Sequence, residues 1–307
     1  PDGTKMYVSD DTSNSVYQYT LSTGFNLSTA SYASKSLSVS SQDTSPFGLA
    51  LNNDGTKMYV LGDSSNTVYQ YTLSTAYDLS TAYYASLSFS VASQDTVPTE
   101  IVFNTDGTKM YILGATNDSI FQYSLSTAFN VSTASYDSVS FSVSSQDSAP
   151  YGLVFNGDGT KMYVYGDTND DVLQYSLSTA FDLSTASYDS VSFDVSSQDS
   201  AAFGIAFNND GTKLYLSGAS NEIIYQYSTV AYTQTLDLST GTYFSFTPSG
   251  ATTVSFTNPP ASGKAVGFAV EINGDGSAIT WPSSVEWPSG TAPTATASKE
   301  LYTFITT

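Results

Sequence analysis

Stretches of apolar residues, each bounded by turn residues, recur in groups of four along most of the chain. In the copy between residues 46 and 93 they cover Phe47–Asn52, Lys57–Leu61, Thr67–Leu73 and Ala85–Val91. The first two are apolar on both faces, the third is mixed, and the fourth alternates strictly between apolar residues and Ser. β-Branched and aromatic residues favour strands, and alternation is typical of a strand with one buried face. The pattern predicts four strands per copy, with burial decreasing from the first strand to the last.

The copies follow one another at a constant interval of 52 residues, marked by Asp-Gly-Thr-Lys at Asp2, Asp54, Asp106, Asp158 and Asp210. A fixed period of this size indicates a repeat architecture. A single four-stranded sheet cannot bury both of its faces, so neighbouring copies must stack. The decrease in burial favours propeller blades, whose inner strands lie between neighbours, over a β-solenoid or a row of separate sandwiches.

Counting strands predicts about five blades with an imperfect seam. Residues 1–42 supply the last three strands of a blade, and full blades cover 46–93, 98–145 and 150–197. Residues 202–229 supply only the first three strands of another. The alternative is that these blades form only part of a larger ring. Because the chain opens inside a repeat and stops on a predicted strand, we expect further residues at both ends.

The repeats resemble the YVTN-type β-propeller family. The resemblance lies in the strings Pro1–Val8, Asp54–Val60 and Asp158–Val164, each followed by a strand that contains Gln-Tyr. It covers residues 1–229 and implies a propeller fold. It implies little about function, because propellers carry many unrelated activities.

The period stops near residue 230, which predicts a propeller domain at 1–230 and a second domain at 231–307. The second segment contains short strand candidates, such as Thr242–Thr247, Val266–Ile272 and Leu301–Ile305, separated by Pro, Gly and Asn turns. We expect a small β-sandwich or jelly-roll-like module, for assembly or attachment.

The second segment is similar to small β-domains of structural and tail-fibre proteins of tailed bacteriophages. The similarity lies in Thr253–Gly263, Ile279–Pro288 and Tyr302–Thr307. It implies a component of a virion appendage. Such fibres are commonly trimers, so a homotrimer is expected from the resemblance.

Composition excludes several classes of function. The 307 residues carry a net charge of −20, with eight basic residues that are all Lys, and no His or Cys. Binding to nucleic acid or to anionic membrane surfaces is therefore not expected, because both are bound by basic clusters. Thiolate metal sites and disulfides are excluded, and no apolar run reaches the roughly 20 residues of a membrane span. Divalent cations are expected to be attracted only non-specifically.

Departures from the repeat give the candidate binding site. The innermost strands begin Pro46-Phe-Gly, Pro98-Thr-Glu, Pro150-Tyr-Gly and Ala202-Phe-Gly, so Glu100 replaces a Gly near the predicted axis. We expect a ligand site at the channel mouth, or else neutral drift at a solvated rim. The candidate residues are Phe47, Thr99, Glu100, Tyr151 and Phe203.

Other candidates have structural alternatives. The Asp-Gly-Thr-Lys loops lack the ligand positions of an EF-hand and are interpreted as hairpin turns. The Gln-Asp pairs that end at Asp43, Asp95, Asp147 and Asp199 either cap backbone N–H groups or ring the channel mouth and bind a cation or sugar. Trp281 and Trp287 are either a glycan or interface platform or ordinary core residues.

No catalytic residue, metal site or cofactor is predicted. His is absent, and only Glu100 and Glu222 among the glutamates lie in the repeats. The sequence therefore predicts a non-enzymatic adhesion or structural component of a virion or cell surface. Its expected partners are other surface proteins or a host glycan or receptor. The alternative is a secreted lactonase-like or glycan-cleaving propeller hydrolase with its site near Glu100.

Overall fold

The computed structural model describes residues 2–230, 232–248, 252–261, 264–274, 278–288 and 290–306. The chain divides into two compact units, Pro1–Gln226 and Tyr227–Thr307. The expected division after residue 230 lies close to this boundary. Within the described residues, no helix has the length and apolar content to cross a bilayer.

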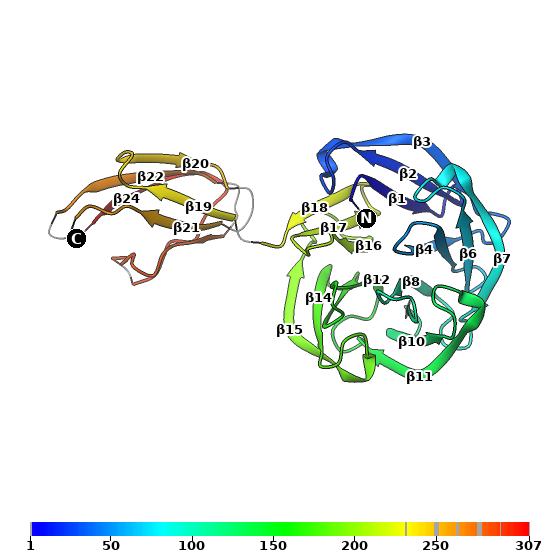
Figure 1. Cartoon of the computed structure of the whole chain (residues 1–307). Helices are drawn as coiled ribbons and strands as arrows, with labels where there is room; N and C mark the ends of the chain where they lie inside the picture. Colours follow the sequence, from blue (N-terminus) through cyan, green and yellow to red (C-terminus); the bar gives the residue numbers. More distant parts are fainter. Residues whose placement is uncertain are drawn as a thin grey trace. The chain divides into compact units, whose positions relative to one another are not determined.

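The first unit is all-β, and its described residues form five antiparallel sheets around a common axis (Figure 1). Three sheets have four strands, and the first and last have three. We call them blades 1 to 5. Their strands are, in order, β1 Lys5–Asp10, β2 Ser15–Leu21 and β3 Ala30–Ser38; β4 Pro46–Leu51, β5 Lys57–Gly62, β6 Thr67–Leu73 and β7 Ala82–Ser90; β8 Pro98–Phe103, β9 Lys109–Gly114, β10 Ser119–Leu125 and β11 Ala134–Ser142; β12 Pro150–Phe155, β13 Lys161–Gly166, β14 Asp171–Leu177 and β15 Ala186–Asp194; and β16 Ala202–Phe207, β17 Lys213–Gly218 and β18 Ile224–Ser228.

The four predicted strands of each full repeat are confirmed, but the predicted gradient of burial is wrong at its start. The second strand, not the first, is the most buried: Met58, Val60 and Leu61 of β5 are fully buried, whereas Leu49 of β4 is only half-buried. The reason is that the second strand is covered by sheets on both faces. The first strand faces the axis, where the inner strands surround open space.

Neighbouring blades are joined by a repeated pair of hydrogen bonds. The Tyr59 hydroxyl of β5 donates to the carbonyl of Phe129 in the next blade, at 2.7 Å. In the same junction Gln70 Oε1 of β6 accepts from the backbone N–H of Val131, at 3.1 Å. Both acceptor and donor lie in the loop before the fourth strand, next to the short 3₁₀ turn η3 Val131–Thr133. Blades 1 and 3 contact their successors in the same way.

The same contact closes the ring between blades 5 and 1. Tyr215 of β17 donates to the carbonyl of Phe25 at 2.8 Å, and Gln226 accepts from the N–H of Leu27 at 3.0 Å. These are the repeat equivalents of Tyr59 and Gln70. Thus five sheets complete one turn, and the closing junction has the same pair of hydrogen bonds as the junctions that follow blades 1, 2 and 3.

The buried Asp of each Gln-Asp pair caps a turn. Asp95 Oδ1 accepts from the N–H of Val97 at 2.8 Å and of Thr116 at 3.2 Å, and its Oδ2 accepts from the N–H of Asn117 at 2.9 Å. A Cβ added at Gly114 would lie 2.2 Å from the Asp95 carboxyl carbon, so Gly is required there. Asp43, Asp147 and Asp199 make equivalent contacts. The backbone-capping interpretation is confirmed, and the carboxylates do not face the channel as a cation or sugar ring.

The second unit has two three-stranded sheets, with strand orders β19-β21-β23 and β20-β22-β24. The strands are β19 Tyr232–Asp237, β20 Tyr243–Phe246, β21 Thr252–Thr257, β22 Gly267–Asn273, β23 Ile279–Thr280 and β24 Lys299–Ile305. Successive strands alternate between the sheets. Among the described residues three of the four pairings are therefore parallel, and only β22 with β24 is antiparallel.

The predicted sandwich or jelly roll is not confirmed. Jelly rolls and immunoglobulin-like sandwiches are built from antiparallel strands, whereas strands that alternate between two sheets return in the same direction. The core between these sheets contains Val254, Phe268, Val270 and Trp281.

Replacing Asp95 with Ala should destabilise the propeller, because three backbone N–H groups would lose a buried charged acceptor. We expect the free energy of unfolding to fall by about 2–4 kcal/mol. Asp106→Ala in the same blade is the matched control, since the exposed Asp106 caps only Thr108, and its cost should be about 1 kcal/mol or less. Urea unfolding of both variants checks this, and equal losses would contradict the capping role.

Candidate functional site

Aromatic side chains from the innermost strands meet near the axis. The Phe47 and Phe203 rings are 5.6 Å apart between centroids, and those of Tyr151 and Phe203 are 5.1 Å apart. Thr99 occupies the fourth equivalent position, is buried, and donates its hydroxyl to the Pro150 carbonyl at 3.3 Å. The structure therefore brings together the predicted residues from four blades. Thr99 has a structural contact and no free hydroxyl.

Glu100 follows Thr99 in β8 and extends over the neighbouring strand β4. Its Oε1 accepts from the N–H of Ile101 at 2.9 Å. A Cβ added at Gly48 would lie 3.1 Å from this oxygen and 2.9 Å from the Ile101 nitrogen. Gly48 therefore makes the close approach of the two strands possible and leaves room for the Glu100 side chain.

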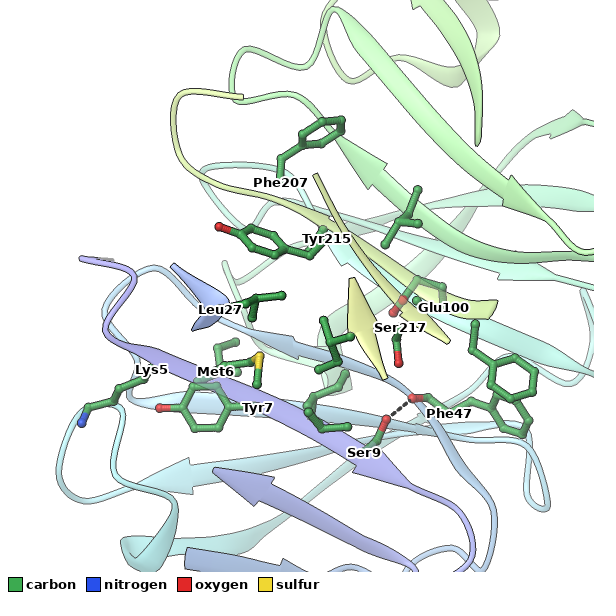
Figure 2. Close-up of a pocket in the computed structure, with 18 of the residues that line it drawn as sticks. Lys5, Met6, Tyr7, Ser9, Leu27, Phe47, Glu100, Phe207, Tyr215 and Ser217 are labelled. Carbon is green, nitrogen blue, oxygen red and sulfur yellow. Dashed lines mark hydrogen bonds between the residues drawn. The ribbon is translucent and has the colours of Figure 1, made fainter. Parts of the chain in front are cut away.

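Glu100 is part of the lining of a cavity of about 400 Å³ at the junction of blades 5 and 1. Figure 2 shows Lys5, Met6 and Tyr7 of β1 along one side, with Tyr215 and Phe207 across from them, and Glu100, Ser217, Ser9 and Phe47 together toward one end. The cavity lies at this junction because no strand of the described chain occupies the innermost position of blade 1, where β4, β8, β12 and β16 lie in the other blades.

Two serines in the cavity are functional candidates that sequence analysis missed. Ser9 and Ser217 occupy one repeat position, which holds Leu61, Leu113 and Tyr165 in blades 2 to 4. Those three bulky residues are fully buried. The signal was present as a departure from the repeat. The two serines could be recognised as neighbours in one cavity only once blades 1 and 5 were known to lie side by side. The Ser9 hydroxyl donates to the Phe47 carbonyl at 2.7 Å.

The surroundings of Glu100 disfavour its charge. Burial raises the pKa of the Glu100 carboxyl to about 8, although backbone hydrogen bonds from Ile101 and Leu49 partly oppose this. The Glu100 side chain is half-buried and lines the cavity. At neutral pH most molecules carry Glu100 as the neutral acid. Near pH 8 about half of them have lost the proton. This property suits a group that transfers protons.

The remaining predicted residues lie elsewhere. Trp281 is 9% exposed and packs against Phe304 and Tyr302, with ring centroids 5.1 Å away in each case. Trp287 contacts Trp281 edge-on at 5.6 Å. Trp281 is thus a core residue of the second unit, and Trp287 is half-buried against that core. Across the described part of the chain, no cluster of three or more acidic side chains could hold a metal ion.

Comparison with known proteins gives similar folds at low identity. No family model and no curated protein matches the chain, so the YVTN-type resemblance stays an expectation. Solved structures that match are propeller-like. One is described as a candidate 6-phosphogluconolactonase from Bacteroides uniformis, with 10% identity, a TM-score of 0.48, and coverage of 74% of this chain and 64% of that one.

Two further matches are similar in quality. A second candidate 6-phosphogluconolactonase, from Bacteroides fragilis, has 11% identity, a TM-score of 0.47, and coverage of 74% of this chain and 64% of that one. The Swd1 β-propeller domain from Myceliophteria thermophila has 8% identity, a TM-score of 0.41, and coverage of 74% and 67%. The chain thus spans less than two thirds of either lactonase-named structure.

These matches correct the functional expectation. The sequence predicted a non-enzymatic virion or cell-surface adhesion component; none of the matches reported carries such a name, and two of them carry the name of a lactonase. The similarity to tail-fibre proteins is not shown by any of the matches reported. At these identities the likeness concerns the fold alone. The chemistry must therefore be argued from the cavity.

Glu100 should make stability depend on pH. The folded protein holds the Glu100 proton up to about pH 8, whereas the unfolded chain releases it near the ordinary value of 4.5. Folded molecules bind more protons between these values, so the stability contributed by Glu100 falls as pH rises from 5 to 9. Glu100→Gln removes this loss. The difference in unfolding free energy between Glu100→Gln and the wild type should therefore be about 1–3 kcal/mol more favourable to the variant at pH 9 than at pH 5.

Urea unfolding at the two pH values measures this difference. Glu222→Gln is the control, because Glu222 lies on an exposed turn, and it should follow the wild type at both. Identical pH dependence in the wild type and Glu100→Gln would contradict the assignment.

Proposed function

We propose that the propeller is a lactonase-like hydrolase that acts on uncharged lactones in the cavity beside Glu100. The observation that carries the proposal is a carboxyl group with a pKa of about 8 that lines a mostly apolar cavity. A general base is most effective when its pKa lies near the working pH. The names of two structural neighbours agree with this reaction class but do not carry the argument.

The reaction needs only one proton-transferring group. The Glu100 carboxylate takes a proton from water as the water oxygen bonds to the lactone carbonyl carbon. The tetrahedral intermediate then collapses, the ring C–O bond breaks, and Glu100 returns the proton to the leaving oxygen. The product is a hydroxy acid, and Glu100 is again a carboxylate.

Hydroxyl donors near Glu100 suit the negative charge that develops on the carbonyl oxygen. Ser217 lines the same part of the cavity, and no partner is assigned to its hydroxyl among the described residues. Ser9 already donates to Phe47, so Ser217 is the better oxyanion donor. Aligned donors of this kind stabilise acyl-transfer intermediates.

The substrate should be uncharged and largely apolar. The cavity wall includes Leu49, Leu51, Phe207 and Ile224, and Lys5 is the one basic residue among the described residues that line it. A phosphorylated lactone would need a cluster of basic donors, and the net charge of −20 repels anions. A glycosidase would need a second carboxylate opposite Glu100. The other carboxylate at the cavity, Asp11, lies exposed on the turn after β1.

Replacing Glu100 with Gln should abolish most hydrolysis. We expect kcat/KM for medium-chain γ- or δ-lactones to fall about 100-fold or more, because general base catalysis typically contributes 10²–10⁴-fold. In the wild type, kcat/KM should rise with pH through an apparent pKa of about 8, as Glu100 loses its proton. Ser217→Ala should lower kcat about 10-fold or more through loss of the oxyanion donor.

A lactone panel assayed by pH-stat titration from pH 6 to 9 provides the test. Glu222→Gln, the other glutamate of the repeats, should match the wild type. Absence of turnover by the folded wild type, or full activity in Glu100→Gln, would overturn the proposal.

A further inference from the structure

Three aromatic rings lie at the same end of the innermost strands. Phe47, Tyr151 and Phe203 are each the second residue of their strand, in β4, β12 and β16. The Phe203 ring meets the other two nearly edge-to-face, with interplanar angles of 73° to Tyr151 and 82° to Phe47. Their aromatic surface is only partly covered, since Phe203 is 39% exposed and the other two are half-buried. We call these three residues the aromatic mouth.

Two half-buried carboxylates lie at this end of the first unit. Asp63 directly follows β5 and Asp167 directly follows β13, and the last residues of these strands pair with the first residues of β4 and β12. Burial raises the pKa of the Tyr151 hydroxyl, and the charges of Asp167 and Asp63 raise it further. Both carboxylates therefore lie within electrostatic reach of the aromatic mouth.

The lysines of the first unit lie at the opposite end of their strands. Lys57 begins β5 and is separated from the glycine that ends this strand by roughly 17 Å, at about 3.3 Å per residue. Four lysines begin the equivalent strands β1, β9, β13 and β17: Lys5, Lys109, Lys161 and Lys213. The sixth, Lys35, pairs with Asp78 at 2.6 Å, and the adjacent Tyr77 bonds to the turn before β5. The carboxylates at the mouth are therefore not balanced by a lysine of the described first unit.

The surroundings of the two carboxylates also favour a cation. Burial and neighbouring carboxylates raise the pKa of Asp63 and of Asp167. Asp167 Oδ1 accepts from the Tyr165 hydroxyl at 3.3 Å. Blade 2 has Leu61 at the position of Tyr165, and Asp63 Oδ1 is enclosed without a hydrogen-bond partner among the described residues. These oxygens therefore attract a cation through their charge, and a ligand that needs no hydrogen bond suits them best.

We propose that the aromatic mouth binds a quaternary ammonium group. Its methyl groups lie against the rings of Tyr151 and Phe203, and Asp63 and Asp167 act as counter-charges. Aromatic faces attract cations through the ring quadrupole, and the attraction grows where water is excluded. A fully alkylated ammonium ion presents apolar surface and no N–H donor, so it matches rings beside enclosed carboxylate oxygens better than a primary amine does.

This inference goes beyond the proposed hydrolysis, because binding of the cation needs neither Glu100 nor a lactone. It is therefore measured without a lactone. A protein that binds the cation but hydrolyses no lactone would contradict only the hydrolase proposal, and hydrolysis without cation binding would contradict only this one.

Isothermal titration calorimetry with choline chloride tests the proposal. We expect saturable binding to the purified chain with a Kd of about 0.1–10 mM, as a few cation–π contacts allow. The alcohol 3,3-dimethylbutan-1-ol has the shape of choline without its charge, and it should bind about tenfold more weakly or worse. Raising NaCl from about 20 mM to about 500 mM should weaken choline binding, because salt screens the carboxylates.

Variants of the mouth locate the site. Tyr151→Leu and Phe203→Leu should each weaken choline binding about fivefold or more, because each removes an aromatic face. Tyr151→Phe keeps the ring and should bind choline as the wild type does. The matched control is Tyr83→Leu, which removes a 56% exposed ring from β7.

A second pair of variants tests the charge and keeps all three rings. Asp63→Asn should weaken choline binding about threefold, whereas Asp106→Asn, in an exposed turn at the lysine end, should not change it. Circular dichroism reports that each variant is folded, and Phe203→Leu and Asp63→Asn decide the result if Tyr151→Leu does not fold. Absence of choline binding by the folded wild type, equal binding of the uncharged alcohol, or undiminished binding in the folded mouth variants would overturn the proposal.

Discussion

The structure of the first unit depends on one constraint: each blade has a sheet with two apolar faces. The second strands show this most clearly, because residues of both orientations in β5, such as Met58 and Tyr59, are fully buried. Neighbouring sheets must therefore cover both faces of every blade, and a linear stack would leave its two ends uncovered. A ring leaves no uncovered end. The Tyr and Gln hydrogen bonds to the loop of the next blade fix the spacing between sheets, and they recur between the last blade and the first.

The junction of blades 5 and 1, which closes the ring, differs from the other junctions in ways that suit a binding site. Blade 1 keeps the contact that closes the ring but has no described inner strand, which leaves the cavity. Small or polar residues replace bulky ones around that space, at Ser9 and Ser217, and Asp10 supplies a cap that elsewhere comes from the preceding blade. Glu100 reaches the space from blade 3 over Gly48. The departures from the repeat thus gather at the junction of blades 5 and 1.

Much of the fold could be predicted from the sequence, because near-identical copies reinforce one another. Turn residues such as Asn53-Asp54-Gly55 located the hairpins, and alternation located the outer strand. The greater burial of the second strand was missed, since it depends on how closely the sheets pack. The pairing in the second unit was also missed. Local patterns mark strands such as β21 and β22 but do not say that successive strands alternate between sheets.

The candidate site was predicted in part. Glu100 and the aromatic residues Phe47, Tyr151 and Phe203 were identified as departures near the axis, and the structure brings them together. Ser9, Ser217 and Asp10 were overlooked, although each also departs from its repeat position. They became meaningful only when ring closure placed blade 1 beside blade 5. The raised pKa of Glu100 could not be read from sequence, because it follows from burial in three dimensions.

Ring closure is the claim on which the cavity and the proposed function depend, and amide hydrogen exchange tests it most directly. The N–H groups of Leu79, Val131 and Leu183 are bound by a Gln of the preceding blade, and the N–H of Leu27 is bound by Gln226 across the seam. In a closed ring, NMR should show the Leu27 amide protected from exchange well above the rate of an unfolded chain, as the other three are. Exchange of Leu27 at the unfolded rate, with the other three still protected, would show that the ring is open and would contradict the account.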